Sequence, residues 1–146
     1  MTRPITKVLV DTSIWSRHLH SKNLHLMALL KSDRVVIHPF VIAELSLYSW
    51  PDRMTVLATL EDMPTAIIAS LEEVRELIEI RSLYDKGIGR VDAHLLSSIV
   101  LSPIPTELWT ADTHLADAAT TLGVLSTLPV PQIVSGSGVD AGSRAR

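Results

Sequence analysis

The run Lys7-Val8-Leu9-Val10-Asp11-Thr12-Ser13 decides the fold expected for this chain. Its apolar, valine-rich residues predict a short, fully buried strand that ends at the carboxylate of Asp11. In open α/β sheets, ligands bind at the carboxyl ends of the strands. A carboxylate at that place needs a partner, which is a set of backbone N–H groups, a cation or a metal. The run therefore indicates a central strand with a candidate functional residue at its end.

Length and composition indicate one globular domain. The chain has 146 residues, of which 47% are hydrophobic and 20% charged, a balance typical of a compact fold. It contains no cysteine, which excludes disulfides, thiolate catalysis and sulfur-ligated zinc, and fits a reducing compartment. No apolar run reaches the length of a membrane span, and the N-terminus has no signal-peptide pattern. We therefore expect a soluble, cytoplasmic protein.

Strands and helices alternate along the rest of the chain. We expect strands or extended segments at 35–37, 66–69, 107–110 and 124–125, and helices at 14–31 (broken near 21–23), 40–49, 52–61, 70–86, 90–100 and 112–122. The helix over 40–49 is apolar on nearly all sides, which predicts that it is buried. This alternation predicts an α/β fold, a small and mostly parallel sheet of about four or five strands with helices on both faces. We expect the domain to span 1–134 and the Gly- and Ser-rich residues 135–146 to form a flexible tail.

Four acids occupy places where a carboxylate either is costly to bury or is held in a defined orientation by the backbone. Asp11 ends the first strand, Glu44 lies in the apolar helix, and Asp92 and Asp112 each open a helix. For Asp92 and Asp112 taken singly, a helix cap is the favoured interpretation, and Asp11 is equally explained as a turn residue. Glu44 has the weakest structural explanation, because a buried carboxylate without a partner costs several kcal/mol.

Taken together, the four acids favour a metal site at one edge of the sheet. An all-oxygen ligand set suits Mg²⁺ or Mn²⁺. The chemistry that needs such a site is phosphoryl transfer or phosphodiester hydrolysis, in which cations bind a phosphate oxygen and activate water. Ser13 and Thr110 are candidates to orient a carboxylate or a water, although a local hydroxyl cap explains either one alone.

The net charge of −3 argues against a broad electrostatic surface for nucleic acid. If four carboxylates bind metal, the net charge of the rest of the chain is −3 − (−4) = +1. The net charge therefore does not exclude a metal-dependent enzyme that acts on phosphates. Arg17, Lys22, Lys86 and Arg90 flank the predicted edge and are candidate phosphate contacts. Charged residues at helix ends and in loops are usually only solvated, and this is the default interpretation of all four.

The four acids and their neighbours resemble the motifs of PIN-domain ribonucleases, specifically the VapC-type toxins of bacterial toxin–antitoxin pairs. Val10-Asp11-Thr12-Ser13 resembles the opening motif, Ala43-Glu44-Leu45 the helix glutamate, Asp92-Ala93-His94-Leu95 the third acid, and Thr110-Ala111-Asp112 the closing motif. The match covers residues 5 to 128 in order and spacing. The chain departs from expectation in its sparse basic surface, which leaves the RNA-binding face undefined.

The resemblance implies a PIN-like domain that acts as a metal-dependent endoribonuclease, usually a homodimer, silenced by a cognate VapB-type antitoxin. It implies that Asp11, Glu44, Asp92 and Asp112 are the catalytic acids and the ligands of Mg²⁺ or Mn²⁺. Asp117 is a further candidate acid, although a helix of that length more often turns such a residue to solvent. Arg17, Lys86 and Arg90 are the candidate RNA contacts.

Other functions remain open at this point. An aspartyl phosphatase requires a second acid two residues after Asp11, where Ser13 stands. A receiver domain requires an acidic pair and a late lysine that are not evident. A catalytically silent PIN-fold module that binds protein or RNA is the alternative from a different class, and the presence of all four acids counts against it. Six histidines show no zinc-site spacing, and we expect His94 and His114 to be solvated or hydrogen-bonded.

Overall fold

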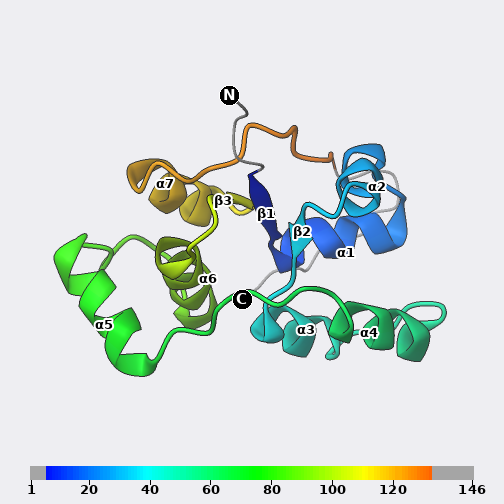
Figure 1. Ribbon diagram of the computed structural model, residues 1–146, viewed down its shortest axis with the longest axis horizontal. Helices are drawn as coiled ribbons and strands as arrows, with labels where there is room; N and C mark the ends of the chain where they lie inside the picture. Colours follow the sequence, from blue (N-terminus) through cyan, green and yellow to red (C-terminus); the bar gives the residue numbers. More distant parts are fainter. Residues whose placement is uncertain (1–5, 133–146) are drawn as a thin grey trace.

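The computed structural model describes residues 6–132, and the centre of the fold is a three-stranded parallel sheet (Figure 1). Its strands are β1 (Lys7–Val10), β2 (Val35–Val36) and β3 (Thr106–Trp109), in the order β2-β1-β3. Val10 pairs with Trp109, so β1 and β3 end side by side. The residues that follow the two strands, Asp11 and Thr110, therefore meet at one edge of the sheet.

The sheet has fewer strands than the four or five expected. The predicted strand at 66–69 is not formed, and the one at 124–125 is reduced to a single parallel bridge, Leu108 with Leu125. A second isolated bridge joins Ile37 with Thr65, just before the predicted segment. Each bridge is held by two backbone hydrogen bonds. In the bridge at Ile37, one of them runs from the Ile37 N–H to the Pro64 carbonyl (2.9 Å). Pro64 has no N–H to donate, which limits a longer ladder at that edge.

Seven helices surround the sheet in the described part of the chain (Figure 1). They are α1 (Thr12–His20), α2 (Leu24–Lys31), α3 (Pro39–Leu45), α4 (Arg53–Glu61), α5 (Leu71–Ile80), α6 (Arg90–Leu101) and α7 (Thr113–Thr121). The predicted break near 21–23 is confirmed, since Asn23 caps α2 by accepting from the Leu26 N–H at 2.9 Å. Among residues 6–132, no helix combines the length and apolarity that crossing a membrane requires.

Both faces of the sheet are covered. Val8, Leu9 and Val10 are consecutive in β1 and at most 1% exposed. Since successive side chains of a strand point to opposite faces, this burial requires apolar cover on each side. Figure 1 shows α6 and α7 around β3 and α1 beside β1, with α5 packed outside α6.

Two helices differ from expectation. The helix predicted over 70–86 ends at Ile80, because the Leu83 N–H bonds back to the Ile78 carbonyl (2.9 Å) and Ser82 takes a left-handed conformation. The buried side chain of Leu83 completes this helix end without a glycine. The prediction that 40–49 is a buried helix is wrong in its second half, since α3 stops at Leu45 and Leu47 is 79% exposed.

Candidate active site

Asp11 is a buried carboxylate held by two hydroxyl groups. It follows β1 and precedes α1, and only 4% of it is exposed. Its Oδ2 accepts hydrogen bonds from Ser13 Oγ and Thr110 Oγ1, both at 2.7 Å. Ser13 and Thr110, which we expected to orient a carboxylate, therefore both bind Asp11. The alternative interpretation of Asp11 as a turn residue that bonds to its own backbone does not account for these two contacts.

The same hydroxyls join the ends of β1 and β3. Thr110 Oγ1 accepts from the Asp112 N–H at 3.0 Å, and Ser13 Oγ accepts from the Ala111 N–H at 2.9 Å. The Asp11 N–H also donates to the Trp109 carbonyl at 3.0 Å. Residues about 100 positions apart in sequence therefore form one hydrogen-bonded cluster, the strand-end cluster, made of Asp11, Ser13, Thr110 and the backbone that follows Thr110.

Glu44 has a partner that the sequence did not suggest. It is half-buried on α3, and its Oε1 accepts from Thr12 Oγ1 at 2.6 Å. The structure supplies a hydroxyl, and not a basic side chain, as this partner. Since Thr12 directly follows Asp11, this bond places α3 next to the strand-end cluster.

Asp92 and Asp112 both act as helix-start residues. Asp92 Oδ2 accepts from the Gly89 N–H at 2.9 Å, and Asp112 Oδ1 accepts from the Leu115 N–H at 3.0 Å. The structural interpretation of each is therefore confirmed. It is compatible with a further role, because a carboxylate accepts several hydrogen bonds or metal contacts at once.

One cavity of about 930 Å³ brings three of the four acids together. Glu44, Asp92 and Asp112 line it, whereas Asp11 does not. The remaining lining residues are mostly apolar or glycine, with three basic side chains: Phe40, Ile68, Ala69, Leu71, Gly87, Ile88, Gly89, Arg90, Val91, His94 and His114. The cavity thus has a carboxylate part and an apolar part.

The acids are not arranged as a ready metal centre. Within residues 6–132, no three His, Asp or Glu side chains form a group that could hold an ion. The donor types nevertheless fit Mg²⁺ or Mn²⁺, which prefer carboxylate oxygens. Metal binding in this cavity requires Glu44, Asp92 and Asp112 to converge, with Asp11 joined to them through Thr12 and Thr110.

The other predicted site residues lie in different places. Arg90 lines the cavity. Arg17 is half-buried and donates to the Pro131 carbonyl at 3.0 Å, and Lys86 is exposed in the loop before α6. Asp117 is exposed on α7 and is absent from the cavity lining.

Two buried histidines were missed as members of this region. His38 is 0% exposed, and its Nδ1 accepts from the Phe40 N–H at 3.0 Å. Burial, with a smaller contribution from His94, lowers the pKa of His38 to about 4. The position of His38 just before Pro39 could have predicted its role as a helix cap, since proline is common at the first position of a helix.

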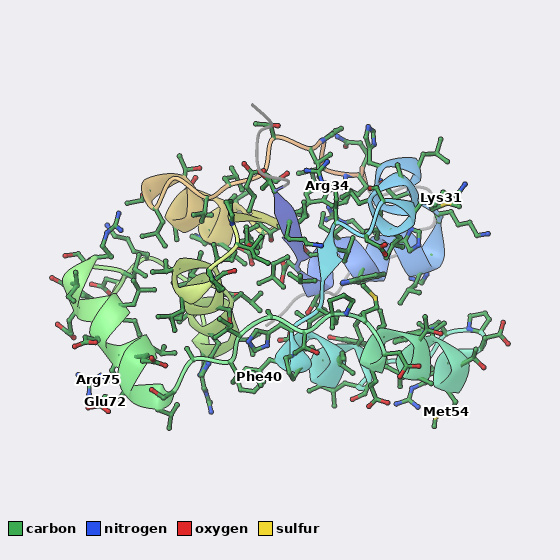
Figure 2. All side chains as sticks on the ribbon, viewed as in Figure 1. Lys31, Arg34, Phe40, Met54, Glu72 and Arg75 are labelled. Carbon is green, nitrogen blue, oxygen red and sulfur yellow. The ribbon has the colours of Figure 1, made fainter. Side chains whose placement is uncertain are left out.

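His94 differs from the expectation that it is solvated or hydrogen-bonded. It is 3% exposed, and its Nδ1 has no hydrogen-bond partner among the described residues. Burial is the main cause that lowers the pKa of His94, and Arg90 adds to it. Phe40 makes T-shaped ring contacts with both imidazoles, with ring centroids 5.1 Å from His38 and 4.7 Å from His94. Figure 2 shows Phe40 in the space between α3 and α6.

Comparison with known proteins identifies the family. No protein-family model matches the chain. Ribonuclease VapC32 of Mycobacterium tuberculosis, from strain CDC 1551 / Oshkosh and equally from strain ATCC 25618 / H37Rv, is 39% identical over 117 residues. This match covers 80% of the chain and 94% of the relative. With the acids placed at the sheet edge and its cavity, the chain belongs to the VapC-type PIN-domain ribonucleases.

Proposed function

We propose that this protein is a divalent-metal-dependent endoribonuclease that hydrolyses RNA phosphodiester bonds as the toxin of a toxin–antitoxin pair. The observation that carries the proposal is the cavity shared by Glu44, Asp92 and Asp112, next to the cluster that orients Asp11. The name of its relative, a ribonuclease, supports the same activity.

The four acids Asp11, Glu44, Asp92 and Asp112 would hold Mg²⁺ or Mn²⁺. When bound, such an ion binds a phosphate oxygen, lowers the pKa of a water and stabilises the leaving oxygen. The chain's own contribution is to orient the ligands. Ser13 and Thr110 fix the Asp11 carboxylate, and Thr12 fixes that of Glu44.

Basic residues near the cavity would contact the RNA backbone. Arg90 is best placed, because it lines the cavity beside the acids. Arg17 and Lys86 remain candidates further from it. A guanidinium at the rim positions phosphates without reading the base sequence.

Two protein partners complete the proposal, a cognate VapB-type antitoxin and a second copy of this chain. Exposed apolar side chains in and between α3 and α4 support a partner surface, since Leu47 is 79%, Tyr48 60% and Met54 71% exposed. We propose that the protein acts in the cytoplasm, where its RNA substrate is made, and that residues 1–134 form the whole domain. The proposed flexible tail, 135–146, lies outside the described residues.

The alternative, a catalytically silent module that binds protein or RNA, is disfavoured. A silent module has no need for four acids in register with the ribonuclease motifs, or for two hydroxyls on a buried carboxylate. The named ribonuclease relative adds to this argument.

The test is cleavage of a total RNA pool by the antitoxin-free protein in Mg²⁺ or Mn²⁺, beside Asp11→Asn and an EDTA control. We expect discrete fragments from the wild type alone, because Asn at position 11 keeps the hydroxyl bonds and removes the charge. Fragments shared by wild type and Asp11→Asn contradict the site assignment. The absence of cleavage together with the absence of Mn²⁺ binding by calorimetry favours the silent module.

A further inference from the structure

Three aromatic rings pack together beside the candidate site. The Phe40 ring contacts the His38 imidazole, at 5.1 Å between ring centroids, and the His94 imidazole, at 4.7 Å. Both imidazoles are buried, and Phe40 is half-buried. We call His38, Phe40 and His94 the ring cluster. Two of its members lie at the start of α3 and the third lies on α6, so it joins two helices that are far apart in the sequence (Figure 2).

The two helices otherwise pack against different parts of the fold. α3 packs mainly against α1 and α4, whereas α6 packs mainly against α5 and β3. The contact between Phe40 and His94 therefore supplies a direct connection between them. Because side chains in a protein interior are close-packed, rings at this place leave little room for the two helices to approach each other.

Each helix carries an acid of the candidate site close to the ring cluster. Glu44 follows Phe40 by four residues, so the two side chains lie on the same face of α3, and both line the cavity. On α6, Asp92 precedes His94 by two residues, and both line the same cavity. The spacing of α3 and α6 therefore sets the spacing of Glu44 and Asp92.

The imidazoles contribute to the ring cluster through shape more than through hydrogen bonds. His38 Nδ1 accepts from the Phe40 N–H at 3.0 Å, which fixes the His38 ring to the start of α3. His38 Nε2 and His94 Nδ1 are buried without a partner among residues 6–132. Native proteins rarely retain such atoms without a reason. Packing against Phe40 supplies one, because it needs flat rings and leaves these two nitrogens unused.

We infer that the ring cluster is a spacer that holds α3 and α6 at a fixed separation and thereby fixes the distance between the Glu44 and Asp92 carboxylates. Its three members are then positioning residues, because they act through the two acids. The inference rests on the proposed metal-dependent function and adds to it the choice of ion. A small ion such as Mg²⁺ keeps bound water and needs few protein ligands, whereas Ca²⁺ takes about six to eight oxygen ligands in a flexible geometry. Acids held at a fixed spacing cannot close around Ca²⁺.

The first test measures the spacing of the two helices without metal. The chain has no cysteine, so Ala43→Cys on α3 and Val100→Cys on α6 place two nitroxide labels at exposed positions. Double electron–electron resonance in EDTA, with the labelled protein diluted in unlabelled protein, should give one narrow distance distribution. Phe40→Leu should broaden or shift this distribution, and Phe40→Tyr, which keeps the ring, should preserve it. An unchanged distribution with Phe40→Leu overturns the inference.

The second test measures ion selectivity by calorimetry with Mn²⁺ and Ca²⁺. Phe40→Leu should lower the Mn²⁺ affinity about tenfold, as is common when a group that orients a ligand is lost. The Ca²⁺ affinity should fall less, so that the ratio of the two affinities decreases, and Phe40→Tyr should restore the ratio. Leu26→Ala is the control, because Leu26 is buried on α2 and lies outside the cavity lining. The inference is wrong if the ratio stays at the wild-type value in Phe40→Leu or decreases equally in Leu26→Ala.

A pair of variants at His94 separates the shape of the ring from the chemistry of the imidazole. His94→Phe keeps a ring and removes both nitrogens, whereas His94→Ala removes the ring. We expect the wild-type affinity ratio in His94→Phe and a reduced ratio in His94→Ala. Equal reductions in the two variants would assign a polar role to the imidazole and contradict the spacer. This pair decides if Phe40→Leu does not fold.

The wild-type protein distinguishes failure of the spacer from failure of the proposed function. Wild-type protein that neither binds Mn²⁺ nor cleaves RNA contradicts the proposed function and the inference together. Wild-type protein that does both, beside a Phe40→Leu variant with the same helix spacing and the same affinity ratio, contradicts the spacer alone. A changed spacing with an unchanged ratio removes the link between the ring cluster and the choice of ion.

Discussion

The two sides of the candidate active site are held in different ways. In the strand-end cluster, the Asp11 carboxylate receives two hydroxyl hydrogen bonds, and each of those hydroxyls accepts a backbone N–H. Around Phe40, at the start of α3 and on α6, His38 Nε2 and His94 Nδ1 are buried without a partner within the described chain. We call this second region the histidine side. Both imidazoles pack against the Phe40 ring, and His38 Nδ1 also accepts a hydrogen bond from the Phe40 N–H.

The difference indicates which side is already organised. Hydroxyl donors with satisfied partners fix a carboxylate at little cost, so the strand-end cluster holds Asp11 in one orientation without any ligand. Buried imidazole nitrogens without partners cost stability. The strand-end cluster is therefore held by satisfied hydrogen bonds, whereas the histidine side is held by packing.

The largest expected effect is at Asp112, whose backbone joins the strand-end cluster while its carboxylate lines the cavity. Asp112→Asn should lower the RNA cleavage rate by about 10³-fold, because a metal ligand contributes several kcal/mol to transition-state stabilisation. Asparagine caps helices as well as aspartate, so thermal stability should change little. Asp117→Asn, exposed on the same helix, is the matched control and should cut at the wild-type rate. Equal rates for the two variants would contradict the assignment of Asp112.

The histidine side predicts a loss of stability in mild acid. The pKa of His38 is about 4 in the folded protein, below the ordinary value of 6.5. Between these values the unfolded chain binds a proton that the folded chain does not, so the free energy of unfolding falls as the pH falls. The full difference corresponds to about 3 kcal/mol. Burial of His94 acts in the same direction. Urea unfolding at pH 7, 5.5 and 4.5 measures the slope.

His38→Asn isolates this contribution from that of the carboxylates. Asparagine accepts the Phe40 N–H as a helix cap and does not titrate. The variant should therefore lose less stability between pH 7 and 4.5 than the wild type. Parallel pH dependences in the two proteins would show that the neutral histidine contributes nothing.

The strand-end cluster predicts a smaller loss from Thr110→Val. The Asp11 carboxylate then loses a donor and the Asp112 N–H loses an acceptor, which together should cost about 1–3 kcal/mol. Cleavage should fall about tenfold, as is common when a group that orients a ligand is removed. Thr110→Ser retains the hydroxyl and should restore both. Thr120→Val removes a hydroxyl that bonds only to the Ala116 carbonyl on α7, and it serves as the control. Wild-type cleavage by Thr110→Val would mean that Ser13 alone positions Asp11.

Sequence reasoning found the strand-end cluster because its signals are local. A valine-rich run that ends in Asp11 predicts both the strand and the position of its carboxylate, and parallel pairing then brings Thr110 alongside. The number of strands was overestimated for a similar reason. Residues 66–69 have β-type composition, but strand length depends on hydrogen-bond partners that composition does not reveal.

The histidine side could not be predicted because it is assembled from separate elements. Phe40 on α3 and His94 on α6 are 54 positions apart, and neither has a neighbour in sequence that indicates the contact. A lone histidine in a helix is ordinarily solvated, and only packing shows that His94 is buried. The partner of Glu44 was missed because threonine at position 12 is also a plausible first helical residue.

The smallest expected effect concerns the rim between the two sides, where Arg90 lines the cavity. One exposed phosphate contact contributes modestly to affinity, so Arg90→Ala should weaken RNA binding about threefold and reduce the salt dependence by about one phosphate. Arg75→Ala is the control, because Arg75 projects from α5 far from Phe40 in Figure 2 and pairs with Glu79 at 3.9 Å. Fluorescence anisotropy in the Asp11→Asn background, at 50 to 300 mM salt, measures binding without cleavage. An unchanged slope for Arg90→Ala would move the phosphate path away from the rim, toward Arg17 or Lys86. The cavity would then retain its acids and its apolar wall but would receive the RNA from another direction.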